Sequence, residues 1–203
     1  MAKSESRYGA RGVSSRKEDV RDAIRNLDQG ISPGAFCKVL PDFLANDPKY
    51  CVIQHADGAG TKAGLAYLHW KLLGDINIWR GIAQDSLVMN FDDVACTGAV
   101  GPFLVSGAIG RNAALIPGEV LTALIEGGES FLSMLAKHGI ECHNAGGETA
   151  DLGDVVRTIV VDNTITTRMR RVDVIDASTI TAPAFIVGFS STGQTIWEDS
   201  PNS

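Results

Sequence analysis

The stretch YCVIQHADGAGTKAGLAYLHW, residues 50–70, organises the interpretation of the whole chain. Tyr50 to Ala56 is mostly apolar and predicts a buried strand that delivers Asp57 at its C-terminal end. Beyond the glycines, leucines return at helical spacing and predict a helix that Gly74 ends. One face of this helix is marked by Leu65, Leu68, His69 and Leu72. The sequence therefore predicts a strand, a Gly-rich turn and a helix in direct succession.

The turn Asp57-Gly58-Ala59-Gly60-Thr61-Lys62 combines groups suited to phosphate and its metal. Glycines allow backbone N–H groups to turn toward an anion, and the N-terminus of a helix adds the positive end of its dipole. Lysine neutralises phosphate charge, and aspartate binds Mg²⁺ directly or through water. The turn is not a P-loop, because Thr61 precedes Lys62 instead of following it. An ordinary Gly-rich connection between strand and helix is the alternative interpretation.

The composition limits the class of protein. A chain of 203 residues with 44% hydrophobic and 21% charged residues is typical of a globular protein with one large domain, or one domain plus part of another. The net charge of −6 argues against a nucleic-acid surface, and the apolar runs are too short to span a membrane. Four cysteines without CxxC spacing predict free thiols in a reducing cytoplasm.

The remaining pattern alternates helices and strands before strands gather near the end. A capping box at 15–18 starts a first helix that carries Val20, Ile24 and Leu27. A helix at 78–90 is predicted to carry Ala83, Leu87 and Asn90 on a common face, with Trp79 in helix packing. A long helix from Pro117 to His138 has the predicted core stripe Leu121, Leu124, Ile125, Gly128, Leu132 and Leu135. Strands are predicted within 101–110 and at 140–145, 155–165, 172–175 and 184–189. The predicted fold is α/β or α+β, a mixed sheet covered by helices.

Two further acidic segments are predicted as loops. The first is Asp92-Asp93, followed by Gly98-Ala99, and the second is the stretch Gly146-Gly147-Glu148-Thr149-Ala150 after a strand. Paired glycines allow a ligand to approach the backbone, and Glu148 offers a hard oxygen ligand for Mg²⁺. Carboxylates that converge on one metal-phosphate site would stabilise charge during phosphoryl transfer. The alternatives are a helix cap with a solvated acid for Asp92-Asp93, and a structural bend for the second segment.

These segments, in this order, resemble the N-terminal domain of the AIR synthetase family, the phosphoribosylformylglycinamidine cyclo-ligases of purine synthesis. The resemblance covers about residues 8–200. It is carried by Asp57 to Lys62 for the family's DGxGTK and by Gly146 to Ala150 for its GGETA. The chain departs from the family pattern at Asp92, where Asn is usual, at Arg11, and at Gly34-Ala35-Phe36, a weakened Gly-Gly-Phe loop.

The resemblance implies ATP-dependent closure of formylglycinamidine ribonucleotide to the aminoimidazole ring, with ATP and Mg²⁺ bound and with a homodimer formed through the sheets. It implies that Asp57, Asp93 and Glu148 organise Mg²⁺ and the nucleotide phosphates, and that Lys62 contacts phosphate. It further implies that the nucleotide is bound by Gly58, Gly60, Thr61, Gly146, Gly147 and Thr149. No general base is assigned.

The domain organisation expected from the sequence has three parts: an N-terminal extension with a helix at 1–30, an ATP-binding α/β domain at 31–183, and a linker at 184–203 into a C-terminal domain outside this chain. Two alternatives to the cyclo-ligase stay open. One is another ATP-using relative, such as a thiamine-phosphate kinase or a selenophosphate synthetase. The other is a non-catalytic nucleotide-binding and dimerisation module. His55 and His143 lie beside the candidate segments, where a hydrogen-bonded structural role is the favoured interpretation.

Overall fold

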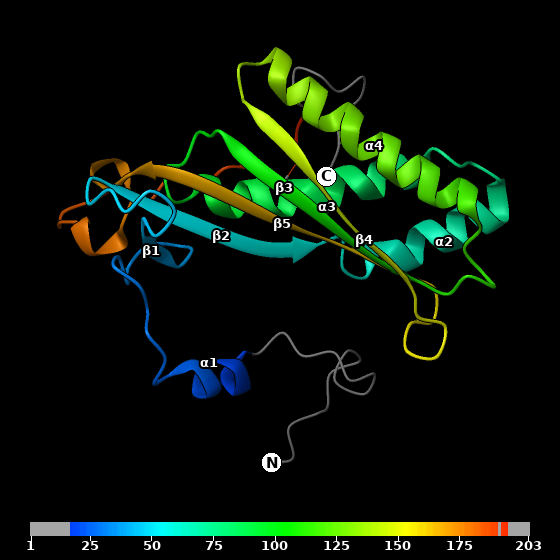
Figure 1. The fold of residues 1–203 in the computed structure, drawn as a ribbon, viewed down its shortest axis with the longest axis horizontal. Coiled ribbons are helices and arrows are strands. Elements are labelled where there is room, and N and C mark those ends of the chain that lie inside the picture. Colours follow the sequence, from blue (N-terminus) through cyan, green and yellow to red (C-terminus); the bar gives the residue numbers. More distant parts are fainter. Residues whose placement is uncertain (1–16, 191, 195–203) are drawn as a thin grey trace.

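The computed structural model describes residues 17–190 and 192–194, and these form a mixed α/β fold (Figure 1). The helices are α1 (Glu18–Ile24), α2 (Lys62–Leu73), α3 (Ile78–Ala95) and α4 (Gly118–Lys137). The strands are β1 (Val39–Pro41), β2 (Tyr50–Gly58), β3 (Phe103–Arg111), β4 (Cys142–Asp151) and β5 (Ile159–Arg170). Two 3₁₀ turns follow, at Arg171–Asp173 and Ala177–Thr179. The predicted fold class is confirmed.

The five strands form one sheet in the order β1-β2-β5-β3-β4. β3 and β4 are parallel and are joined by α4, the crossover helix that a parallel pair requires. All other neighbours are antiparallel, and β5 lies between β2 and β3. In this order, the C-terminal end of β2, the N-terminal part of β5 and the segment Gly146–Ala150 of β4 line up across the sheet, with β3 between β5 and β4.

Helices α2, α3 and α4 pack together on one face of the sheet (Figure 1). Strand residues alternate accordingly: Phe103 and Val105 are buried in the core beneath α3 and α4, whereas Leu104 between them is 50% exposed on the opposite face. The predicted common face of α3 is confirmed, because Ala83, Leu87 and Asn90 are all buried. Within residues 17–190, these helices thus cover one side of the sheet.

The buried face of α2 differs from the face that its leucines mark. Leu65, Leu68 and Leu72 are between 57% and 81% exposed, and the helix buries Ala63, Ala66 and Trp70 instead. The alanines let α2 approach closely, while the Trp70 ring lies edge-on to Trp79 of α3 at 6.1 Å. Burial of the large indole therefore sets the rotation of this helix, and the predicted packing role of Trp79 is confirmed.

Several predicted elements need correction. In α4, Ile125 is 55% exposed and does not belong to the buried face of the helix, which includes Phe131. The first helix ends at Ile24, and Ser15 of its predicted capping box lies outside the described residues. Val172 and Asp173 belong to the 3₁₀ turn Arg171–Asp173, and residues 174–175 are irregular. Residues 184–189 form no strand, and their side chains are exposed. In the portion of the chain covered by the structure, every helix lacks the combination of length and apolarity required to cross a bilayer.

Candidate nucleotide site

The segment Asp57–Lys62 forms the predicted connection between a strand and a helix. Asp57 and Gly58 are the last residues of β2, Gly60 has a φ of +54°, and α2 begins at Lys62. The backbone N–H of Gly58 donates to Asp57 Oδ1 at 2.7 Å, so the carboxylate is held against its own turn. The first N–H groups of α2 lie immediately beyond, where the helix dipole favours an anion, and those of Lys62 and Gly64 already donate to carbonyl oxygens of the turn.

Glycine is required at position 58 because a neighbouring side chain leaves no space for a Cβ atom, and the sequence did not reveal this neighbour. A Cβ atom at this position would lie 1.8 Å from Asp162 Oδ1 and 2.6 Å from the carbonyl oxygen of Val161. Burial, and then the charge of Asp57, raise the pKa of Asp162 above its ordinary value. Asp57 and Asp162 are therefore two interacting carboxyl groups at this end of the sheet. The pairing of Gly58 with Asp162 across β2 and β5 creates this contact, and no local motif around residue 162 marks it.

Lys62 extends from the start of α2 toward α3. Its Nζ lies 3.1 Å from Asp85 Oδ2, and its side chain is 63% exposed. An exposed ion pair of this kind is weak, so the ammonium group remains able to bind an anion at the N-terminus of α2. Asp85 is a second acidic residue that the sequence did not single out.

Asp92 and Asp93 do not form a loop, which corrects the prediction. They belong to the last part of α3, which continues to Ala95 because no Gly or Pro interrupts it there; Gly98, with a φ of +86°, lies just beyond. Asp93 Oδ2 lies 3.2 Å from His55 Nε2 on β2. Burial, and then the charge of Asp93, raise the pKa of Asp92. His55 is hydrogen-bonded, as predicted.

The segment Gly146–Ala150 is also not a loop, but lies within the edge strand β4. It pairs with β3, with a register shift opposite Val105 and Gly107 that forms a β-bulge. Gly146 has a φ of +84° at this bulge, and a Cβ on Gly147 would lie 2.1 Å from the carbonyl oxygen of Gly107. The paired glycines thus serve close strand packing as well as an open backbone.

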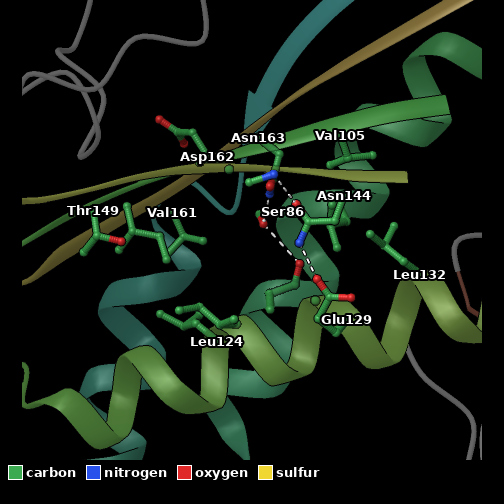
Figure 2. Close-up of a pocket in the computed structure, with 18 of the residues that line it drawn as sticks. Ser86, Val105, Leu124, Glu129, Leu132, Asn144, Thr149, Val161, Asp162 and Asn163 are labelled. Atoms are coloured by element: carbon green, nitrogen blue, oxygen red, sulfur yellow. Dashed lines mark hydrogen bonds between the residues drawn. The ribbon is translucent and has the colours of Figure 1, made fainter. Parts of the chain in front are cut away.

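A cavity of about 240 Å³ lies between this part of β4 and the helices (Figure 2). Side chains of α4 and of the strands give it apolar walls, among them Leu124, Leu132, Val105 and Val161. Its polar groups include two asparagines held by neighbours: Asn163 donates to Ser86 Oγ at 2.6 Å, and Asn144 donates to Glu129 Oε1. Gly146, Gly147, Glu148 and Thr149 all line it. The cavity therefore combines an apolar interior with a polar border, as small-molecule sites do.

The three carboxylates predicted to hold Mg²⁺ are not gathered into one group. Glu148 lines the cavity, whereas Asp57 and Asp93 do not, and the described residues contain no set of three His, Cys, Asp or Glu side chains arranged for a metal. Asp57 and Gly147 occupy one row of the sheet three strands apart, a backbone separation of about 14 Å. An elongated ligand, rather than a single ion, is the kind of group that can span this distance.

The oxygen donors nevertheless fit Mg²⁺ with a phosphate ligand. Mg²⁺ is usually held by one or two carboxylates together with substrate phosphates and waters, and does not need a complete protein cage. Asp57 is fixed beside glycine backbone at the start of α2, which suits this arrangement.

Comparison with known proteins places the chain in a family. Residues 37–169 match the family model described as AIR synthase related protein, N-terminal domain, and the chain belongs to this family. The matched region includes Asp57–Lys62, Asp93 and Gly146–Ala150. It lies inside the predicted domain 31–183, although the proposed domain boundaries themselves stay a prediction. The comparison with curated protein sequences gives no match.

Several solved structures are similar to the chain. Thiamine monophosphate kinase from Aquifex aeolicus is 10% identical over 75% of this chain and 41% of that protein, with a TM-score of 0.40. PurL from T. maritima, complexed with ATP, is 12% identical over 74% and 23% respectively, with a TM-score of 0.39. PurLQS from Thermotoga maritima is 10% identical over 76% and 24%, with a TM-score of 0.41. The chain spans less than half of the length of each of these proteins.

Proposed function

We propose that this chain is the ATP-binding half of a phosphoribosylformylglycinamidine cyclo-ligase. The reaction closes formylglycinamidine ribonucleotide to aminoimidazole ribonucleotide and releases ADP and phosphate. One observation carries the proposal: the family match over 37–169 contains both DGAGTK and GGETA, the motifs by which the chain resembles the cyclo-ligases. We propose further that the enzyme acts in purine synthesis and lies in the cytoplasm.

Each proposed binding residue has a physical role. The turn Gly58–Thr61 and the N-terminus of α2 would bind nucleotide phosphates, and Lys62 would neutralise part of their charge. Asp57 and Asp93 would hold Mg²⁺ with phosphate oxygens from the β2 side. Glu148 would act from β4, with Gly146, Gly147 and Thr149 bordering the cavity. The separation between the two sides suits a nucleotide together with its second substrate.

The chemistry requires activation of an otherwise poor leaving group. ATP supplies a phosphoryl group to the formyl oxygen of the substrate; an amine nitrogen attacks the same carbon, and phosphate leaves as the ring closes. The residues of this chain would orient the phosphates and balance their negative charge, which is the main protein contribution to phosphoryl transfer. The carboxylates would then act through the metal ion that they hold.

The test uses the full-length protein with ATP, Mg²⁺ and formylglycinamidine ribonucleotide. We expect ADP and aminoimidazole ribonucleotide to form in equal amounts. Lys62→Ala should weaken ATP binding, whereas Lys137→Ala, at the exposed end of α4, should leave it unchanged. ADP formation with thiamine phosphate in place of the ribonucleotide would assign the protein to the kinases instead. Nucleotide binding with no turnover of either substrate would favour a non-catalytic module.

We also propose that two copies pair through the sheet face that α2, α3 and α4 leave open. Leu104 and Val160 are 50% and 42% exposed on strands whose neighbouring residues are buried. Burial of such residues against a second sheet would stabilise a dimer through the hydrophobic effect. This arrangement is the one that the family resemblance implies.

A further inference from the structure

Asn90 lies at the centre of a buried network between β2, β5 and α3. Asn90 is 1% exposed. Its Nδ2 lies 3.0 Å from the carbonyl oxygen of Asp57 and 3.1 Å from those of Asn163 and Ser86. One amide group thus shares its two protons among carbonyls of two strands and of its own helix. The C-terminal end of β2, where Asp57 lies, is fixed to α3 by this amide.

The orientation of the Asn90 amide continues the network to Asp93. Because Nδ2 faces three carbonyl oxygens, Oδ1 must point the other way, and it lies 3.3 Å from His55 Nδ1. The opposite nitrogen of the same ring, Nε2, lies 3.2 Å from Asp93 Oδ2. Both ring nitrogens of His55 therefore face acceptor oxygens, and the ring bridges the amide and the carboxylate.

We propose that Asn90 and His55 are positioning residues for Asp57 and Asp93, the one through the backbone of Asp57 and the other through the carboxylate of Asp93. Neither acts on the ligand: Asn90 fixes the backbone that carries Asp57, and His55 orients the Asp93 carboxylate. The inference rests on the proposed function, because it takes these two aspartates as groups that bind the metal-nucleotide. Its physical basis is independent of the motifs, since Asn90 and His55 lie outside DGAGTK and GGETA.

Part of this arrangement is structural, because an apolar side chain at position 90 would leave three carbonyl oxygens without the donor that Asn90 supplies. Here the bonds extend from the backbone of one proposed ligand residue to the carboxylate of the other. Groups that orient metal-binding residues in this way typically contribute about 10–100-fold to metal affinity.

The experiment compares Asn90→Leu and His55→Leu in the full-length protein with the control Thr97→Val. Thr97 is another buried polar residue, just beyond α3, whose hydroxyl donates to the carbonyl oxygen of Val94 at 2.6 Å. Calorimetry would measure ATP binding across a Mg²⁺ titration and in EDTA. We expect both test variants to need about 10–100-fold more Mg²⁺ for half-maximal binding, with affinity for metal-free ATP unchanged. Excess Mg²⁺ should restore binding, which it would not do for a general folding defect.

Wild-type Mg²⁺ dependence in folded Asn90→Leu and His55→Leu would overturn the positioning role. If Asn90→Leu does not fold, His55→Leu decides alone, because the His55 side chain is already 22% exposed and tolerates replacement better. If the wild type catalyses cyclisation and the variants keep the wild-type Mg²⁺ dependence of ATP binding, this inference is rejected and the proposed function stands. Wild-type binding of Mg²⁺-ATP without cyclisation rejects the proposed reaction, and a shifted Mg²⁺ dependence in the variants would still support the positioning role.

Discussion

Single residues at the end of β2 show how closely the site is packed. Gly58 has no space for a methyl group, because Asp162 Oδ1 occupies that position from β5. The role of Gly58 was predicted from the need for an open backbone near phosphate, but its neighbour could not be predicted. The register that pairs residues 58 and 162 arises from two strands far apart in the sequence, and local spacing carries no information about it.

Asp162 gives a prediction for the dependence of stability on pH. Its pKa is raised in the folded protein, so the folded state holds this proton more tightly than the unfolded state. The contribution of the Asp162 proton to stability is therefore fully present below the unfolded pKa of about 3.9, and it is lost as the pH rises through the folded pKa. Asp162→Asn should remove this loss, so that the stability of the variant relative to wild type increases as the pH rises from about 4 through the raised folded pKa.

Urea unfolding of both proteins at several pH values measures the effect. Asp154→Asn is the matched control, because Asp154 is exposed and lies in the connection between β4 and β5. A constant difference in unfolding free energy across this pH range would contradict the raised pKa of Asp162.

The presence of a helix or strand was easier to predict than the residues at its ends or the face that it buries. The strand at 50–58, the helix at 118–137 and the common face of α3 follow from periodicity, which local sequence encodes well. Asp92-Asp93 was predicted as a loop because the two acids follow the helix predicted at 78–90 and precede Gly98-Ala99, yet α3 extends through both. The segment Gly146–Ala150 was predicted as a turn, but pairing with β3 makes it strand, and tertiary pairing of this kind overrides the preference of glycine for turns.

Helix α2 provides a direct test of which face is buried. Trp70→Ala should destabilise the protein by about 3–5 kcal/mol, because it removes a large ring packed against Trp79. Leu72→Ala should change the unfolding free energy by less than about 0.5 kcal/mol, since Leu72 is 81% exposed. Chemical denaturation of both variants measures this difference. A larger cost for Leu72→Ala than for Trp70→Ala would mean that the leucine face, not the tryptophan, packs against the protein.

For the whole molecule, the one-sided covering of the sheet is the main consequence of the chain order. The sequence predicted a sheet covered by helices, but it did not reveal that α2, α3 and α4 share one face (Figure 1). Strand alternation at Phe103-Leu104-Val105 allows one residue to face the core and the next to face away. Which helices cover which face depends on connections across the entire chain, so it could not be obtained from local patterns.

The open face predicts a measurable assembly. If dimers form through it, Leu104→Arg should place a charge in the interface and raise the dimer dissociation constant at least about tenfold. Leu72→Arg on α2 is the matched control, with the same substitution on an exposed surface away from the sheet face, and should leave the dimer intact. Sedimentation equilibrium would measure both. A monomeric wild type, or a Leu104→Arg variant whose dimer is as stable as that of the wild type, would reject pairing through this face.

The position of β4 at the end of the strand order has one more consequence. A terminal strand presents a row of backbone donors and acceptors that a foreign extended peptide can join, which is a common route to aggregation. In this chain the same strand carries Glu148 and the bulge at Gly146, and both a charge and a bulge are devices that discourage such unwanted pairing. Replacement of Glu148 or Gly146 is therefore expected to lower solubility, besides any effect on ligand binding. Solubility and ligand binding must be measured separately for variants of this segment.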